Sequence, residues 1–438
     1  MKKIKKTVGF FTLGCKVNQY ESEAIGELFA LRGYQVVSPH TVCDVYVINS
    51  CTVTAESDRK VRQTIRRAVA QNPSAYILVT GCLAETAPES LAQIEGVDYI
   101  CGNADKCSVA DAADRLISAG KKNQKAVIHR PSLDGAPFEC MSIKKFDRTR
   151  AYIKIEDGCE SRCTYCIIPK ARGSIRSKKP EDVINEVREL TLGGCREIVL
   201  TGIETASYGK DLNNYTLADL LTEVDRIPNI GRIRLGSLDP SLMKQNFVDR
   251  IAKLHALAPH FHLSMQSGSD NILHLMKRKY NTAMALENIQ RIRRSIPNVM
   301  LTTDIIVGFP GESEEDFLQT MEFAEKAEFL MIHVFPYSGR RGTPAAAMNE
   351  QIPMEIRRKR ASILSELASV SRAKLLQREI QQSPVCEVLF EDYKNGYVYG
   401  HTANFIEVRA KSEQSLDSQM ACVRFLHTDG NIITAEIL

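Results

Sequence analysis

The chain has 438 residues, which is too long for a single ordinary core and indicates two or three domains. Hydrophobic residues make up 44% of it, enough to form buried cores. Its 13 cysteines are odd in number and unevenly spaced, which argues against the disulfide framework of a secreted protein and favours reduced thiols. A formal net charge of +4 permits an RNA partner without requiring one, because phosphate binding depends on local patches.

The start of the chain, MKKIKK followed by VGFFTLG, imitates a signal peptide. The apolar run is short, however, no small-residue cleavage site follows it, and the polar segment KVNQYESE begins at once. We therefore expect a strand here and a cytoplasmic protein. Because no apolar run approaches the roughly 20 residues that span a bilayer, we expect no membrane anchor.

The next segments alternate between strand and helix patterns up to residue 118. Strand-like runs cover 7–13, 44–50 and 76–81, and helical patterns lie near 21–32, 55–71 and 105–118. This order predicts a parallel α/β sheet, whose ligands bind beyond the carboxyl ends of its strands. A cysteine follows each of the three strands: Cys15, Cys51 and Cys82.

The spacing alone leaves two interpretations of these three cysteines. They form one ligand site, or they are buried structural thiols, which are common in cores. Cys101 also follows a strand-like run, and Cys43 and Cys107 lie in the same predicted domain. Residues 121–144 carry Pro and Gly but few periodic apolar residues, and they predict a linker.

A second cysteine group lies in AYIKIEDGCESRCTYCIIPKARG, residues 151–173, directly after a strand-like run. Cys159, Cys163 and Cys166 form a CxxxCxxC pattern, which can hold three corners of a cubane iron–sulfur cluster and leave one iron open. A tetrahedral zinc site would need a fourth ligand, and no other His or Cys lies nearby in the sequence. The alternatives are a zinc knuckle or three buried thiols.

Six strand-like runs alternate with helical patterns from Ala151 onward, at 151–156, 196–202, 232–237, 260–266, 300–309 and 329–338. Six βα units predict a partial (β/α)6 barrel, two units short of a complete one. Arg340 and Arg341 follow the sixth run, where they would meet an anionic RNA backbone or form solvated loop charge.

After Ser383 the pattern changes to short strands with turn signals, which predicts a small antiparallel β-barrel of OB type. This segment carries four basic and eight acidic residues, a net charge of −4. RNA binding there would depend on a local face, with bases stacking on Tyr393, Tyr397, Tyr399 or His401.

Three segments that contain the N-terminal cysteines, TLGCKVNQYES, VINSCTVT and VTGCLAE, resemble the cluster-binding segments of the methylthiotransferases, a branch of the radical S-adenosylmethionine (SAM) enzymes. The resemblance extends over nearly the whole chain. It implies an N-terminal methylthiotransferase domain at 1–120, the linker at 121–144, a radical SAM core at 145–374 and a TRAM domain at 375–438, which grips tRNA in the family.

The resemblance also implies two 4Fe-4S clusters. Cys159, Cys163 and Cys166 would hold the cluster that binds and cleaves SAM. Cys15, Cys51 and Cys82 would hold an auxiliary cluster on which a sulfur atom is methylated before its transfer. Family positions that line SAM match four further residues here: Tyr165, Glu204, Gln266 and Ile306. Gln266 also fits an ordinary satisfied polar group, and Ile306 a core residue.

The implied reaction is methylthiolation at C2 of threonylcarbamoyladenosine at position 37 of tRNA, with two SAM molecules and a flavodoxin-like or ferredoxin-like electron donor. Lys170 stands where the form CIIPYARG has Tyr. Isopentenyladenosine in tRNA and an aspartate of a ribosomal protein are alternative substrates. From another class, the chain would be an iron–sulfur or zinc RNA-binding protein without turnover. Seven cysteines receive no role: Cys43, Cys101, Cys107, Cys140, Cys195, Cys386 and Cys422.

Overall fold

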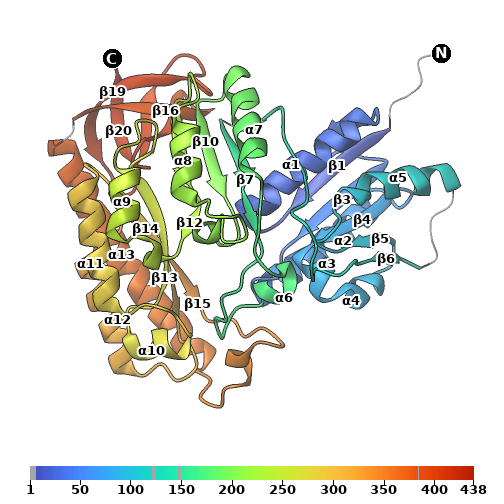
Figure 1. Ribbon diagram of the computed structural model, residues 1–438, viewed down its shortest axis with the longest axis horizontal. Helices are drawn as coiled ribbons and strands as arrows, with labels where there is room; N and C mark the ends of the chain where they lie inside the picture. The colour runs from blue at the N-terminus through green and yellow to red at the C-terminus, as the bar shows by residue number, and fades with distance from the viewer. Residues whose placement is uncertain (1–5, 121–124, 147–148, 383) are drawn as a thin grey trace. The chain divides into compact units, whose positions relative to one another are not determined.

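The computed structural model describes residues 6–120, 125–146, 149–382 and 384–438 (Figure 1). Ser383, the expected start of the C-terminal barrel, lies outside the described residues, as do residues 1–5 and the first four residues of the expected linker. The chain forms two compact units. The first comprises 1–143, 152–179 and 338–343, and the second comprises 144–151, 180–337 and 344–438. No described helix is long and apolar enough to cross a membrane.

A six-stranded parallel sheet forms the centre of the first unit, with strand order β2-β1-β3-β4-β5-β6. The prediction of a parallel α/β sheet is thereby confirmed. Two strands have only three residues each, too few to show a period, and were not predicted; the second of them, β6, lies within the expected linker. The strands are β1 (Thr7–Thr12), β2 (Gln35–Val37), β3 (Val45–Ser50), β4 (Tyr76–Gly81), β5 (Val97–Cys101) and β6 (Val127–His129).

Helices cover both faces of this sheet. Helices α1 (Lys16–Leu31) and α5 (Ser108–Ala119) contact each other, and Arg32 of the first turn beyond α1 forms an ion pair with Asp111. Helices α2 (Ala55–Gln71), α3 (Cys82–Thr86) and α4 (Pro88–Ala92) share a separate apolar core with β3, β4 and β5. The first unit also contains α6 (Ile168–Arg172) and the two-stranded pair β8 (Glu156–Asp157) and β9 (Arg176–Ser177).

The predicted six-strand partial barrel is confirmed as two parallel sheets, β11-β10-β7 and β12-β13-β14-β15. The third predicted run is divided at Gly236 into β11 and β12, and a Cβ atom there would lie 2.9 Å from the Thr201 hydroxyl oxygen. The strands are β7 (Arg150–Lys154), which crosses the boundary between the units, β10 (Glu197–Thr201), β11 (Arg232–Leu235), β12 (Ser237–Leu238), β13 (His260–Gln266), β14 (Met300–Val307) and β15 (Met331–Pro336).

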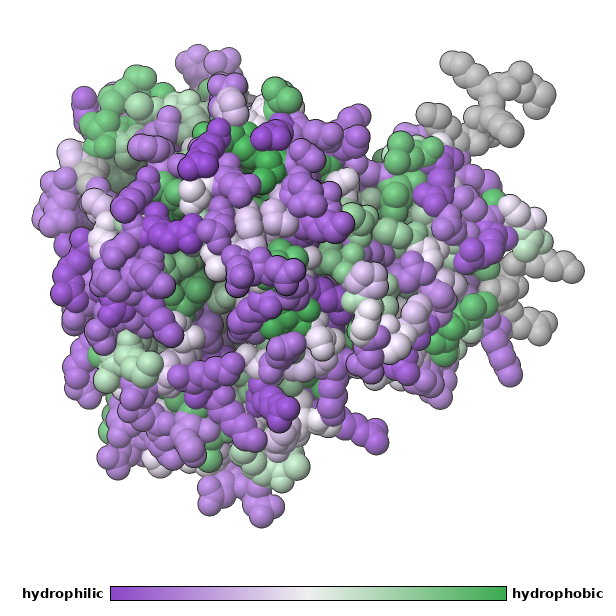
Figure 2. All heavy atoms as spheres, viewed as in Figure 1, coloured by the Kyte–Doolittle hydropathy of each residue, from purple (hydrophilic) through white to green (hydrophobic). Residues whose placement is uncertain are grey.

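Amphipathic helices follow these strands and place their apolar sides on the sheets. Capping boxes begin two of them, Thr216 with Asp219 and Ser313 with Asp316. Around α11 and α12 the visible surface is mainly hydrophilic (Figure 2). The helices are α7 (Pro180–Leu192), α8 (Leu217–Asp225), α9 (Gln245–Ile251), α10 (Asp270–Leu275), α11 (Thr282–Ser295) and α12 (Glu314–Ala327), with short 3-10 turns η1 (Thr205–Ser207), η2 (Pro240–Leu242) and η3 (Pro344–Ala347).

The long helix α13 (Met354–Gln382) runs without interruption through the expected boundary at 374–375, and its Leu376 belongs to the core of the C-terminal barrel. That barrel is closed, with order β16-β17-β18-β20-β19 and a single parallel pair, β18 with β20. This order confirms the predicted OB-type barrel. Its strands are β16 (Val385–Lys394), β17 (Tyr397–Thr402), β18 (Glu407–Lys411), β19 (Met420–Thr428) and β20 (Ile433–Ile437).

Candidate cluster and cofactor sites

The N-terminal cysteines follow three adjacent strands of the first unit. Cys15 comes after β1, Cys51 after β3 and Cys82 after β4, so all three lie at the carboxyl edge of the sheet. Between β1 and β3 the strand order reverses, which creates the crevice where α/β sheets bind ligands. Gly14, with φ +109°, lies against Cys51, because a Cβ atom on this glycine would be 3.2 Å from the Cys51 sulfur.

Two of the three thiols at this edge, those of Cys15 and Cys51, have raised pKa values. Burial raises the pKa of Cys51, and the nearby Cys82 raises it further. Loss of hydration also raises the pKa of Cys15, against the opposing effect of the Arg172 guanidinium. Thiolates are therefore favoured here only when a cation binds them.

Arg172, at the end of α6 in the segment CIIPKARG, reaches this cysteine site. Its Nε donates a hydrogen bond to the sulfur of Cys82 at 3.3 Å, and another guanidinium nitrogen donates to the Asn18 side chain at 2.7 Å. Asn18 in turn donates to the carbonyl oxygens of Leu13 and Ser50. The arginine thus connects the helix after the second cysteine group to the loops that carry the first group.

Arg172 belongs to a fully buried charge cluster. Its guanidinium pairs with Glu21 at 2.6 Å and with Asp157 at 3.2 Å. Lys106 and Lys154 also pair with Glu21. Burial alone would raise the pKa of Glu21, but the guanidinium and the two ammonium groups hold that pKa well below its usual range.

Burial opposes the charge of both lysines in this cluster, but their pKa values shift in opposite directions. The pKa of Lys106 is lowered by burial and by the neighbouring arginine. Burial also opposes the charge of Lys154, but Glu21 and Asp157 together raise its pKa. Arg176 also pairs with Asp157, at 3.6 Å, so the cations of this cluster outnumber the carboxylates of Glu21 and Asp157, and a thiolate at Cys82 would offset part of the excess positive charge. This surplus fits an anionic set of sulfur ligands.

The second cysteine group lies in the loop between β8 and α6, and all three of its residues are half-buried. The amide of Ser161 donates to the Cys159 sulfur, and the amide of Ile168 donates to the Cys166 sulfur, both at 3.4 Å. Amide donors to sulfur stabilise thiolate ligands and tune their clusters. Gly158 permits this turn, since a Cβ atom there would lie 1.9 Å from the carbonyl oxygen of Ser174.

Sulfur spacing distinguishes a cluster from a single zinc ion. Sulfur ligands about 2.3 Å from a tetrahedral zinc ion are about 3.8 Å apart. Throughout the part of the chain that the structure describes, only His262, Asp304 and His333 bring three possible ligand atoms within 4.8 Å of one another. Neither cysteine group is that compact. Among the described residues, therefore, neither cysteine group has the close spacing of ligands around a single tetrahedral ion.

The predicted SAM contacts are divided between the units, with Tyr165 in the first and Glu204, Gln266 and Ile306 in the second. Gln266 ends β13 at a register shift with φ +71°, a strained conformation that is concentrated at functional sites. Ile306 is half-buried on β14 rather than in the core. Glu204 precedes η1 and borders a cavity of about 360 Å³ together with Lys210, Lys244, Lys279 and Asp239.

Two residues expected to meet RNA have other partners. Arg340 forms an ion pair with Asp58 at 2.7 Å and donates to the Thr52 hydroxyl, while Arg341 is exposed. His401 binds Glu391 at 2.6 Å and stacks on Phe405, so its ring is engaged within the barrel. Tyr393 and Tyr397 remain exposed, at 37% and 36%.

Five of the seven unassigned cysteines have raised pKa values. Burial raises the pKa of Cys101 and Cys386 to about 12 and that of Cys195 to about 11. Burial also raises the pKa of Cys43 and Cys107. Cys43, Cys101 and Cys195 are buried, Cys107 and Cys386 are half-buried, and Cys140 and Cys422 are exposed.

Comparison with known proteins agrees with this geometry. The model of the radical SAM superfamily matches residues 153–324, and that of the uncharacterized protein family UPF0004 matches residues 7–102. The threonylcarbamoyladenosine tRNA methylthiotransferase MtaB of Bacillus subtilis is 38% identical over 427 residues, which is 96% of this chain and 94% of that protein. The chain belongs to the radical SAM methylthiotransferase family.

Other relatives of this methylthiotransferase carry two different names. MtaB of Thermotoga maritima is 38% identical over 93% of this chain and 95% of its own length. The tRNA-2-methylthio-N(6)-dimethylallyladenosine synthase of Desulfitobacterium hafniense is 35% identical over 89% of this chain and 87% of its own length. Among solved structures, the radical SAM methyltransferase TsrM of Kitasatospora setae has a TM-score of 0.55 at 17% identity, covering 78% of this chain and 75% of its own, a likeness of fold alone.

Arg172, Glu21 and Lys106 were not identified from the sequence. Glu21 lies in TLGCKVNQYES and Arg172 in CIIPKARG, so a charged residue within a cysteine-containing motif was an available signal. Lys106 had none, because nothing in a linear pattern reveals that a lysine pairs with a carboxylate 85 residues away.

Proposed function

We propose that this methylthiotransferase replaces the hydrogen at C2 of threonylcarbamoyladenosine, at position 37 of tRNA, with a methylthio group. One observation carries the proposal: the full-length 38% identity to a relative named for that substrate. The relatives named for dimethylallyladenosine reach 32–35% identity, so the alternative tRNA base is the second candidate.

On the base, the reaction breaks the C2–H bond and forms a C2–S bond, and a second C–S bond forms between the transferred sulfur and the methyl group. The hydrogen leaves on 5′-deoxyadenosine, the methyl group comes from a second SAM molecule, and a flavodoxin-like or ferredoxin-like protein supplies the electrons. Two 4Fe-4S clusters, when bound, would supply the one-electron chemistry that cleaves SAM and the sulfur that is transferred. Cys159, Cys163 and Cys166 would hold the first cluster.

The residues of the first unit would prepare the second cluster site. Cys15, Cys51 and Cys82 would ligate it from three strand ends. The buried Arg172 would lower the cost of a thiolate at Cys82 through its charge and its Nε–H donor. Asn18 fixes that guanidinium from the other side, which keeps the donor directed at the sulfur.

Four residues would serve SAM itself. Glu204 would accept hydrogen bonds from its ammonium group, and Tyr165, Gln266 and Ile306 would line its adenosine. Such a site needs to exclude water, because a carbon radical takes hydrogen from any nearby donor. The apolar side chain of Ile306 suits that requirement.

Mass spectrometry of tRNA nucleosides tests the substrate. A deletion strain should lose 2-methylthio-threonylcarbamoyladenosine and regain it with the native gene. Loss of the dimethylallyl product instead would identify the second candidate.

Cluster content is tested separately on anaerobically reconstituted protein, which should hold about eight iron atoms per chain. Replacing Cys159, Cys163 and Cys166 by Ala should remove about half the iron and abolish release of 5′-deoxyadenosine from SAM and dithionite. The corresponding change of Cys15, Cys51 and Cys82 should remove the other half and leave SAM cleavage partly intact. Full iron retention in either variant would refute the ligand assignment, and wild-type protein that releases no 5′-deoxyadenosine would be an RNA-binding protein without turnover.

A further inference from the structure

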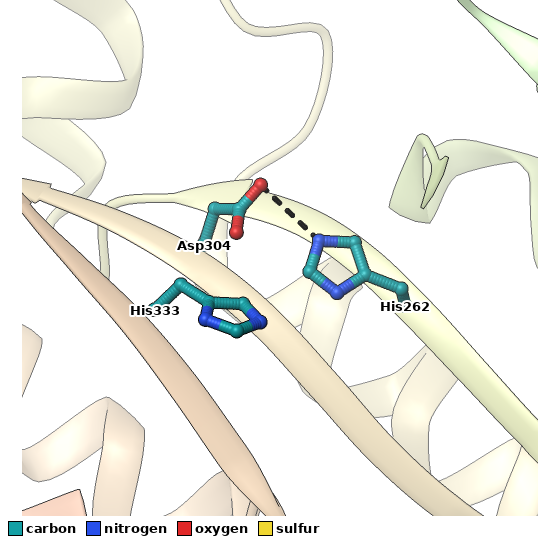
Figure 3. Close-up of side chains that lie close together, drawn as sticks. All are labelled: His262, Asp304 and His333. Atoms are coloured by element: carbon teal, nitrogen blue, oxygen red, sulfur yellow. Dashed lines mark ion pairs between the residues drawn. The ribbon is translucent and has the colours of Figure 1, made fainter. Parts of the chain in front are cut away.

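We propose that His262, Asp304 and His333 form a binding site for a divalent transition-metal ion such as Zn²⁺, distinct from both cysteine groups. All three residues belong to the second unit, and they come from neighbouring parallel strands β13, β14 and β15. Figure 3 shows their side chains directed toward one another. Two imidazoles and one carboxylate are a ligand set that suits Zn²⁺ and Fe²⁺.

The strand register explains why these side chains meet. His262 pairs with Thr302, two residues before Asp304, while Asp304 pairs directly with His333. Because side chains alternate between the faces of a strand, Thr302 and Asp304 lie on one face with both histidines. Neighbouring strands are about 4.8 Å apart, so three ligands on one face converge without any loop.

The separation between His262 and Asp304 matches that around a bound ion, and the separations to His333 stay below 4.8 Å. The Nε2 atom of His262 lies 3.2 Å from a carboxylate oxygen of Asp304, and the ligand atoms of all three residues lie within 4.8 Å of one another. Atoms bound about 2.0–2.1 Å from a tetrahedral zinc ion are about 3.3 Å apart. His333 is exposed, so rotation of its side chain can shorten the longer separations.

Thr302 supplies the support that ligating histidines generally have. Its hydroxyl oxygen lies 3.0 Å from Nδ1 of His262 and 3.0 Å from Nε2 of His260. When the single hydroxyl proton is donated to His260, the Nδ1–H of His262 donates to Thr302, and Nε2 then presents its lone pair to Asp304. In this tautomer the Nε2 lone pair and the carboxylate oxygen repel at 3.2 Å, and a metal ion between them satisfies both, whereas a proton on Nε2 forms the ion pair instead.

The site is accessible to an ion from solvent. The side chains of His262 and Asp304 are 13% and 28% exposed. Three protein ligands leave at least one coordination position for water or another oxygen ligand. The site is therefore of the open kind rather than a closed structural one.

Zinc binding to cluster-loaded enzyme tests the proposal. The reconstituted enzyme is incubated with ZnCl₂ and desalted, and zinc and iron are counted per chain. We expect one zinc ion beyond the iron content, with nitrogen and oxygen neighbours at about 2.0–2.1 Å in its X-ray absorption spectrum and no sulfur at about 2.3 Å. Asp304→Asn and His333→Gln should each weaken zinc binding at least tenfold.

His255→Gln is the matched control, because His255 is an exposed histidine of the same unit, and it should bind zinc like the wild type. Unchanged melting temperatures would show that the variants fold. Three results would overturn the proposal: no retained zinc, equal zinc in wild type and Asp304→Asn, or sulfur in the coordination shell. Each leaves the iron content untouched, so it is separate from failure of the proposed function.

Discussion

At the scale of single residues, the cysteine sites depend on neighbours that have no metal-binding chemistry. Gly158 and Gly14 permit close approach of the backbone beside a cysteine, and Arg172 supplies charge and a donor. These residues explain why three cysteines at the right spacing are not enough to define a site.

Gly158→Ala should prevent iron loading at Cys159, Cys163 and Cys166. The residue has φ +88°, and an added Cβ atom would collide with the carbonyl of Ser174, so the turn must move. We expect iron to fall to about half and SAM cleavage to disappear. Gly120→Ala is the control, since Gly120 has φ +66° but nothing within 4 Å of the added carbon. Equal iron in both variants would contradict this account.

Arg172→Lys should weaken the other cysteine site. Lysine keeps the charge but loses the planar set of donors that joins Cys82, Asn18 and Glu21. We expect the unfolding free energy to fall by on the order of 1–3 kcal/mol, because buried acceptors lose their donors. Iron at Cys15, Cys51 and Cys82 should fall with it, while SAM cleavage continues. The exposed Arg162 provides the control Arg162→Lys, and similar iron loss there would argue against a specific role.

At the scale of elements, a buried ion cluster joins strands β7, β10 and β11 to the C-terminal barrel. Glu197 on β10 binds Arg234 at 2.7 Å and Arg150 at 2.9 Å. Arg234 also donates to the carbonyl of Ala403 and lies over the ring of Phe405. The C-terminal barrel therefore contacts the arginines of these strands directly, in addition to its connection through α13.

Glu197→Gln should destabilise the second unit by about 3–5 kcal/mol at neutral pH, because it leaves buried arginines without their carboxylate. Burial alone would raise the pKa of Glu197, but Arg234 and Arg150 outweigh it and hold the pKa at about 2. A depressed pKa means that this stabilisation is complete above about pH 4.5 and is lost as the pH falls toward 2.

Melting temperatures of wild type and Glu197→Gln between pH 7 and pH 3 measure this effect. The difference between the two proteins should narrow below about pH 4.5. Glu189→Gln on α7 is a suitable control, because Glu189 is exposed and its distance to Lys144 is 3.8 Å. A difference that stays constant down to pH 3 would show that the charge of Glu197 is not what stabilises the strands.

At the scale of the whole molecule, tRNA binding has to combine an acidic C-terminal barrel with basic groups elsewhere. Deleting the barrel is a poor test of its role, because the deletion would uncover Arg150, Arg232 and Arg234. Point substitutions on its surface avoid that difficulty.

Replacing Tyr393 and Tyr397 by Ala should weaken tRNA binding without changing its dependence on salt. A base stacked on an aromatic ring contributes about 1–3 kcal/mol, so the affinity should fall roughly 5-fold to 150-fold for each base that stacks. The paired change to Phe keeps the rings and should bind normally. Affinities at several salt concentrations measure both quantities, and a loss in the Phe variant would point to the hydroxyl groups instead.

Arg341→Ala should instead lower the slope of log affinity against log salt concentration by about 1, since one phosphate contact is lost. Arg340 is not an equivalent candidate, because it already pairs with Asp58. Lys359, an exposed residue on α13, supplies a control of the same charge in Lys359→Ala. An unchanged slope in Arg341→Ala would remove this residue from the RNA interface.

The sequence by itself determined the features that repeat or lie close together in the chain. Alternating strand and helix periods predicted the parallel sheet, the six-strand partial barrel and the OB-type barrel, and CxxxCxxC predicted one cysteine group. These signals are local, because a strand period or a short metal motif is complete within about 10 residues.

Only the tertiary structure decided which distant residues act together. Arg172 meets Glu21 across 151 positions of sequence, Arg340 meets Asp58 across 282, and His262 meets Asp304 through strand register. A charged residue looks the same in sequence whether it is solvated or buried beside a partner, and the register of parallel strands depends on the crossover helices between them. For that reason the cysteine motifs were predictable, while the buried charges around them and the histidine site were not.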